Sequence, residues 1–126
     1  MKQLKIEPTS ATPAILFDKE KGLFQIEGNA YPADVIPFFE PVVSWLGEYL
    51  KNPNPVTEFN IKLAYISSNS LKEILILLKM LIPLKEKQQV IIKWYSLPED
   101  DDMLESGEFL QEMTGLNFEF PVTDGL

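Results

Sequence analysis

Three serines and one asparagine stand where a strand pattern runs into a helix pattern, within the segment Tyr65 to Lys72. Hydroxyl and amide side chains are the types that satisfy the free N–H groups of a helix N-terminus. The same position favours an anion, because the helix dipole and the peptide N–H groups point toward it. A phosphate on one of these serines would be well placed, so the corner is a candidate phosphorylation site.

The chain has 126 residues and contains neither cysteine nor histidine. These absences remove disulfides, thiolate nucleophiles and cysteine zinc sites, together with the commonest general base. A serine hydrolase would need an activating base, and Asn69 stands where a Ser-x-x-Lys motif ending at Lys72 would need its serine. We therefore expect no enzymatic activity and no cofactor. The acidic run Glu99 to Asp102 is interpreted as a helix start and not as a metal site.

Nineteen acidic and eleven basic side chains give a formal net charge of −8. This charge repels phosphate backbones and anionic lipid headgroups, so neither nucleic acid nor a membrane surface is expected as a partner. The most apolar segment, Ile74 to Leu84, contains Lys79 and Pro83 and is too short to span a bilayer. The sequence predicts a cytoplasmic protein whose residues 1–126 form one domain.

The first half of the chain predicts a hairpin followed by a helix. Short strands are expected at Ala14 to Phe17 and Leu23 to Glu27, joined by a charged turn that ends in Gly22. Apolar residues at helical spacing then predict a helix from Asp34, its N-cap, to Leu50. Pro41 removes an interior hydrogen bond, so we expect a kink there or a later helix start.

The second half predicts a strand, a helix and a strand with short links. Alternating apolar residues indicate a strand at Phe59 to Tyr65. The nearly continuous apolar run from Leu71 to Ile82 indicates a buried helix. Another strand is expected at Val90 to Tyr95. Such a unit requires a parallel strand pair and a right-handed crossover. Tyr65 and Trp94 lie on strand patterns and are expected in the core.

A third helix is expected from the acidic run to about Met113, with Gly115 as its C-terminal stop, and a last short strand around Phe118 to Phe120. The expected order is therefore β-β-α-β-α-β-α. This order predicts an α/β (α+β) fold in which about three α-helices pack on a mixed β-sheet.

Five short pieces of the sequence carry a family resemblance: Thr12-Pro13-Ala14-Ile15, Gly28 with Tyr31-Pro32, Trp45, Tyr65 through Lys72, and Lys93-Trp94. In this order and spacing they resemble the landmarks of the SiaC family of bacterial regulatory phosphoproteins. The resemblance covers about Thr9 to Phe120. It implies a STAS-like sheet with packed helices, similar to the fold of anti-sigma-factor antagonists, and the element order read from the residues agrees.

The resemblance also implies a function. Proteins of this family resemble phospho-switches in which a partner kinase phosphorylates a hydroxyl at the strand-to-helix corner and a PP2C-like phosphatase removes the phosphate. The unmodified form binds and activates a diguanylate cyclase, an enzyme of the cyclic-di-GMP signalling that controls biofilms. Carried onto this chain, the acceptor is Ser68, with Ser67 and Ser70 as competing positions. The implied partner-binding residues are Ser67, Ser68, Asn69, Lys72, Tyr31 and Pro32.

The serines of the corner also have possible roles that do not involve phosphorylation. Ser70 and Glu73 have the spacing of a capping box, which favours a capping role for Ser70. Ser68 taken alone would be an ordinary turn hydroxyl at a helix start. The chain could then be a structural or assembly module of the same fold, or a partner switch of the anti-sigma-factor-antagonist type.

Overall fold

The computed structural model describes residues 1–126 as one six-stranded sheet with three α-helices and one 3₁₀ segment. The elements, in chain order, are β1 (Leu4–Ile6), β2 (Ala14–Asp18), β3 (Leu23–Ala30), α1 (Val35–Tyr49), β4 (Val56–Ile66), α2 (Ser68–Lys79), η1 (Ile82–Glu86), β5 (Gln89–Trp94), α3 (Asp101–Thr114) and β6 (Asn117–Glu119).

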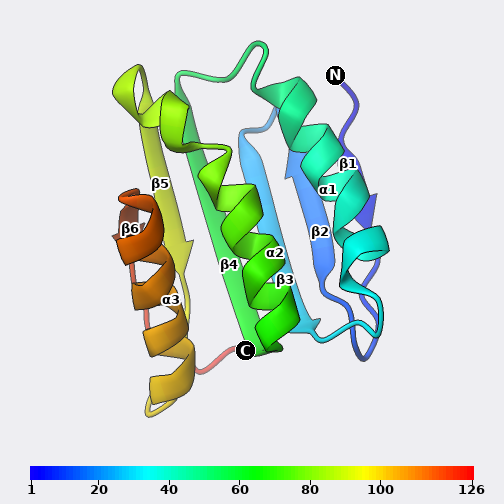
Figure 1. Cartoon of the computed structure of the whole chain (residues 1–126), viewed down its shortest axis with the longest axis vertical. Helices are drawn as coiled ribbons and strands as arrows, with labels where there is room; N and C mark the ends of the chain where they lie inside the picture. The colour runs from blue at the N-terminus through cyan, green and yellow to red at the C-terminus, as the bar shows by residue number, and fades with distance from the viewer.

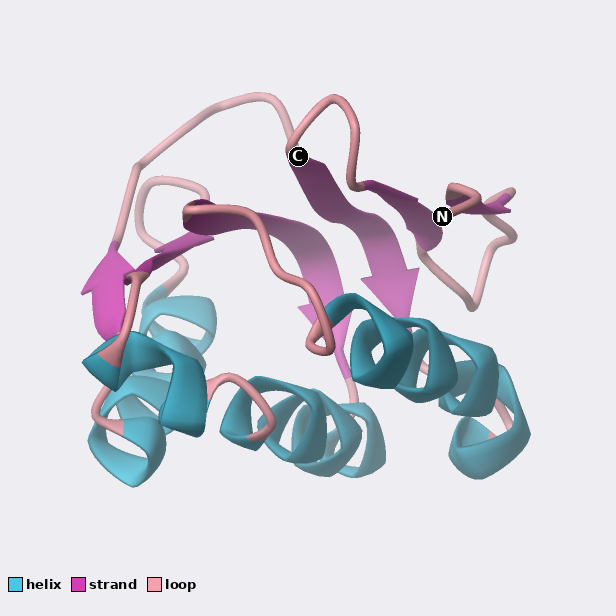
Figure 2. Ribbon diagram, turned by 90° about the horizontal axis from the view of Figure 1, so that it is seen from above, coloured by secondary structure: helices cyan, strands magenta, loops and turns pink.

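The strands lie in the sheet in their order along the chain, from β1 to β6. The first three strands are antiparallel neighbours, whereas β3, β4, β5 and β6 run parallel. Each parallel pair is connected through one α-helix. Because strand order advances in one direction and such crossovers share one hand, all three helices come to one face of the sheet. Figures 1 and 2 show α1, α2 and α3 side by side on that face.

Burial alternates along the strands, which separates a core face from an open face. Residues that point toward the helices, such as Phe24, Phe59 and Ile92, are fully buried, and the Phe24 and Phe59 rings stack with centroids 5.3 Å apart. The opposite face carries mostly polar side chains, and there Lys93 Nζ lies 3.5 Å from a Glu58 carboxylate oxygen. The predicted mixed α/β fold, including the parallel β4–β5 pair, is confirmed.

One predicted helix start is confirmed and another is wrong. α1 begins at Val35 directly after the predicted N-cap Asp34, whose side chain forms no capping hydrogen bond, and it continues past Pro41 to Tyr49, so the alternative of a later start is wrong. The hydrogen bond that Pro41 removes would involve the carbonyl of Pro37 in the first turn, and the buried face of the helix compensates for this single loss. α2 begins at Ser68, three residues before the predicted Leu71.

The ends of the chain add two short edge strands. β1 was not predicted, because three residues are too few for an alternation pattern to be recognised. β6 and α3 agree with the sequence analysis: Asp100 Oδ1 accepts from the Met103 N–H at 3.1 Å, and Gly115 ends α3 with a φ of 67°. None of the helices combines the length and the apolar character that crossing a bilayer requires.

Candidate functional site

The corner between β4 and α2 is held by Ser67. Its backbone is extended, and its N–H donates to the carbonyl oxygen of Ala30 at 2.8 Å, which ties the corner to the end of β3. The Ser67 hydroxyl accepts from the Ser70 N–H at 3.2 Å and donates to the Ser70 hydroxyl at 3.0 Å. Ser67 is therefore the N-cap, and the predicted capping role of Ser70 is wrong. A cap needs an extended backbone, which Ser67 has and Ser70, inside the helix, does not.

The first two residues of α2, Ser68 and Asn69, have exposed side chains that form no hydrogen bond within the chain. The N–H groups of a first helical turn lack intrahelical acceptors, and the Ser67 cap satisfies only that of Ser70. Lys72 lies one turn further on, is exposed, and takes part in none of the three ion pairs. Ser68 thus faces solvent beside free backbone donors and an unpaired cation.

Two tyrosines stand beside this corner. Tyr31 follows β3 and Tyr65 is near the end of β4; they are 43% and 54% exposed, and their rings meet edge to face with centroids 5.5 Å apart. The expectation that Tyr65 lies in the core is wrong. Gly28 pairs with Leu63 but Asn29 pairs with Tyr65, so Ala64 is an extra residue in β4. This bulge shifts the alternation and turns the tyrosine outward.

Several landmarks that are distant in sequence converge at this end of the sheet. The Tyr31 N–H donates to the carbonyl oxygen of Ala11 at 2.8 Å, which ties the loop before β2 to the chain after β3. Gly28 has a φ of 127°, and a Cβ there would lie 3.5 Å from Pro13 Cα. Because β3 and β4 are parallel, their carboxyl ends bring the tyrosines and the serine corner to one edge. The sheet therefore assembles most of the predicted partner-binding residues.

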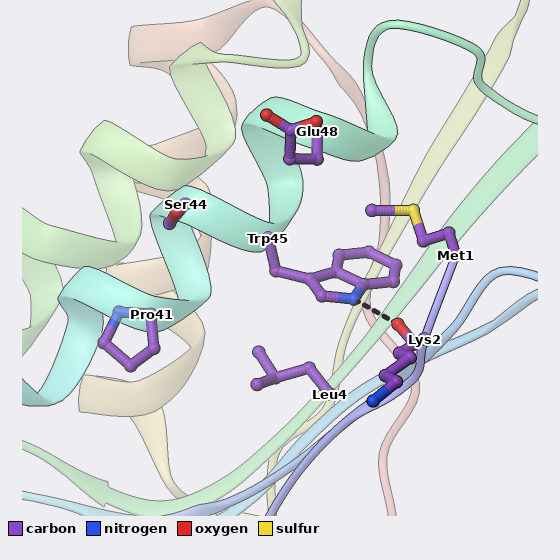
Figure 3. Close-up of a pocket in the computed structure, with 7 residues that line it drawn as sticks. All are labelled: Met1, Lys2, Leu4, Pro41, Ser44, Trp45 and Glu48. Atoms are coloured by element: carbon purple, nitrogen blue, oxygen red, sulfur yellow. Dashed lines mark hydrogen bonds between the residues drawn. The ribbon is translucent and has the colours of Figure 1, made fainter.

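The two tryptophan landmarks have structural positions. Trp94 is fully buried, as predicted, and its Nε1–H donates to the Met103 carbonyl oxygen at 2.8 Å. Trp45 points toward the N-terminal segment, and its Nε1–H donates to the Lys2 carbonyl oxygen at 2.8 Å (Figure 3). No predicted site residue lines the hollow beside Trp45, which is formed by Met1, Lys2, Leu4, Pro41, Ser44, Trp45 and Glu48.

Comparison with known proteins decides the family. The family model described as "SiaC family regulatory phosphoprotein" matches residues 6–122, nearly the whole chain. The chain belongs to the SiaC family. The resemblance inferred from the five sequence landmarks is thereby confirmed.

Solved structures of SiaC proteins share the fold. SiaC of Pseudomonas aeruginosa superposes with a TM-score of 0.87 at 23% identity, over 98% of this chain and 100% of that one. A chain in the crystal structure of the diguanylate cyclase SiaD in complex with its activator SiaC, also from Pseudomonas aeruginosa, gives a TM-score of 0.87 at 24% identity. That match covers 95% of this chain and 99% of the other.

An uncharacterised protein of Pseudomonas aeruginosa strain UCBPP-PA14 is 26% identical over 98% of this chain and 99% of its own length.

Sequence reasoning missed two exposed apolar side chains on α1 and α2 of this SiaC-family chain. Ile36, in the first turn of α1, is 64% exposed, and Ile76, in the middle of α2, is 50% exposed. Ile76 stands in an apolar run whose other members are mostly covered, so the run itself did not reveal which member faces solvent. The only available signal was helical phase, which places Ile76 one turn after the exposed Lys72.

Proposed function

We propose that this chain is a non-enzymatic regulatory phosphoprotein of the cytoplasm whose unmodified form binds and activates a diguanylate cyclase. A partner kinase would transfer a phosphoryl group to the Ser68 hydroxyl, and a PP2C-like phosphatase would remove it. The observation that carries the proposal is the exposed Ser68 at the first residue of α2, beside the exposed Tyr31–Tyr65 pair. The known complex of SiaD with its activator SiaC supports the choice of partner.

The surroundings of the three serines favour Ser68 as the acceptor. Ser70 is 0% exposed, so a kinase could reach it only after α2 opened. The Ser67 hydroxyl already holds the cap through its two hydrogen bonds with Ser70. Ser68 has neither constraint, because its side chain is exposed and unbonded. Phosphorylation at Ser68 therefore costs no native hydrogen bond.

A phosphate at Ser68 interacts favourably with the free protein but opposes binding of the partner. The helix dipole, the free N–H groups of the first turn and Lys72 all favour an anion at this position. A phosphoserine carries about −1.5 to −2 charges, which would change the formal net charge from −8 to about −10. A partner that covers the corner with an apolar or acidic surface must desolvate or repel this group. A hundredfold loss of affinity corresponds to about 2.8 kcal/mol, which is enough for a switch.

Phosphopeptide mapping after reaction with the cognate kinase tests the acceptor. We expect the label on Ser68 and none on the Ser68→Ala variant. A phosphate found only on Ser67 or Ser70, or equal labelling of the alanine variant, would show that the assignment is wrong.

Calorimetric titration with the diguanylate cyclase of the same organism tests the switch. Unmodified protein and Ser68→Ala should bind, whereas the phosphoprotein and Ser68→Asp should bind about a hundredfold more weakly with an unchanged circular dichroism spectrum. Equal or tighter binding by the phosphoprotein would reverse the sign of the electrostatic argument. Intact mass of the protein from its native cells distinguishes the switch from an assembly module that is never modified.

A further inference from the structure

The outer surface of α3 carries an exposed apolar pair. Phe109 is 43% exposed and Met113 is 47% exposed, and four-residue spacing makes their side chains neighbours on the helix surface. The buried side of α3 is formed by other residues: Met103, Gly107, Leu110 and Thr114. Aromatic and methionine side chains are enriched in protein–protein interfaces, and an uncovered pair of them is typical of a binding surface.

The same helix is strongly acidic. α3 contains no basic residue, and its five carboxylates are all exposed and absent from the three ion pairs of the chain: Asp101, Asp102, Glu105, Glu108 and Glu112. Glu105 precedes Phe109 by four residues and Glu112 follows it by three, so carboxylates flank the apolar pair. A partner that covers the pair must therefore bring basic groups next to an apolar one.

This acidic face of α3, formed by Glu105, Phe109, Glu112 and Met113, lies near the corner that carries Ser68. α2 and α3 pack side by side and begin at the same end of the sheet, since each follows the carboxyl end of a parallel strand (Figure 1). Phe109 is about 12 Å along the axis from the start of α3, and packed helices have axes about 8 to 10 Å apart. A standard interface covers about 800 Å² on each partner, roughly 30 Å across, so one partner can contact both places.

We propose that the acidic face of α3 is a docking site for a basic, apolar surface of the PP2C-like phosphatase. This inference rests on the proposed function and adds to it a second surface by which the phosphatase binds its substrate. Phosphatases commonly hold two divalent metal ions at the active site, whereas a kinase brings the anionic ATP, so carboxylates near the corner favour approach of the phosphatase. A second copy of this chain is a poorer occupant, because its own net charge is −8.

The position of the acidic face determines how it contributes to dephosphorylation. The face is on a different helix from the phosphate, so its contacts with the phosphatase are the same in the substrate complex and in the transition state. Uniform binding of this kind lowers KM and leaves kcat unchanged. Charge pairs at the rim of an interface mainly speed association, and salt weakens them.

Steady-state dephosphorylation of the phosphoprotein by the phosphatase of the same organism tests the apolar pair. Phe109→Ser should raise KM about tenfold or more and leave kcat unchanged, and Met113→Ser should act in the same direction. Val56→Ser is the control, since Val56 is similarly exposed at 46% but begins β4 at the opposite end of the sheet. Melting curves should show that all three variants fold. A KM of both α3 variants equal to wild type, or an equal rise in the control, overturns the proposal.

The charge of the occupant has its own test. Glu105→Lys combined with Glu112→Lys should raise KM about tenfold or more, and added salt should raise the KM of wild type more than that of the variant. The control combines Glu20→Lys with Glu86→Lys, which changes the net charge equally at exposed positions outside α3 and should leave KM unchanged. An unchanged or lower KM in the α3 variant, or an equal rise in the control, overturns the assignment of a basic partner.

Other occupants give different results. If Phe109→Ser slows phosphorylation by the kinase but not dephosphorylation, the kinase binds this face and the proposal is wrong. If light scattering shows a dimer that Phe109→Ser dissociates, the occupant is a second copy of this chain and the proposal is also wrong.

The two proposals fail in different ways. If the phosphatase releases phosphate from Ser68 of wild type and of the α3 variants with the same KM, the switch stands and only the docking site is wrong. If the kinase labels no serine of the wild type, both proposals are wrong.

Discussion

Phosphorylation of Ser68, which we propose weakens binding of the cyclase, is expected to stabilise the fold. The phosphate would stand at the first residue of α2, where the dipole contributes about 0.3 to 1 kcal/mol for an exposed anion. Lys72 follows at i+4 and has no other ionic partner; such a pair adds about 0.2 to 0.5 kcal/mol. The sum is a gain of about 0.5 to 1.5 kcal/mol, since no native hydrogen bond of Ser68 is lost.

Thermal unfolding of the phosphoprotein and the unmodified protein, followed by circular dichroism at low ionic strength, measures this gain. For a domain of this size the midpoint should rise by about 2 to 6 °C. The gain should shrink in 0.5 M salt, because exposed charges are screened. Lys72→Gln in the phosphoprotein should remove only the part of the stabilisation that comes from the ion pair and leave the part that comes from the helix dipole.

A lowered midpoint on phosphorylation would refute this reasoning. It would show that the phosphate disrupts the Ser67 cap or the α2 N-terminus, so that the switch acts by local unfolding. A rise that persists unchanged in high salt would also contradict it, because the gain would then not be electrostatic.

The remaining predictions concern the core and the tyrosine pair. Gly107→Ala should lower the free energy of unfolding in urea by about 1 to 3 kcal/mol, although alanine has a better helix propensity than glycine. The reason is that the new Cβ would lie 2.7 Å from Trp94 Cγ. A stabilised variant would contradict this. Ile74→Ala, at a fully buried position, should lower the free energy of unfolding by about 2 to 5 kcal/mol in the same assay. Leu75→Ala should lower it less, because the Leu75 side chain is partly exposed. The reverse order would show that α2 is rotated about its axis. Tyr65→Ala should reduce affinity for the cyclase severalfold, while the free energy of unfolding stays within about 0.5 kcal/mol of wild type. Equal affinity would exclude the tyrosine from the interface.

Local patterns predicted most of the fold because they report local physics. Alternation over Phe59 to Leu63 revealed which side chains of β4 are buried, and the Asp100 cap with the Gly115 stop bounded α3. The short link between a strand, a helix and a strand required the parallel β4–β5 pair. The β1 strand escaped notice because its three residues carry no period.

The candidate site was predicted by residue type and family landmarks, but its details depended on contacts between distant segments. Nothing local distinguishes Ser67 from Ser70 as the cap. The structure ties the Ser67 N–H to the Ala30 carbonyl oxygen of β3, a contact between distant segments, and the Ser67 hydroxyl accepts from the Ser70 N–H. Tyr65 is exposed because a register shift opposite Gly28 interrupts the alternation, and register belongs to a strand pair.

By itself the sequence determined the chemistry that is available: three serines and an asparagine at a helix start, no histidine or cysteine for catalysis, and an acidic surface. Those properties belong to residue types and short spacings, which no tertiary contact changes. Only the tertiary structure decided which serine is accessible, and which apolar residues of α1 and α2 remain uncovered between the helices. Accessibility depends on what the rest of the chain packs against a residue, and packing is a property of the whole fold.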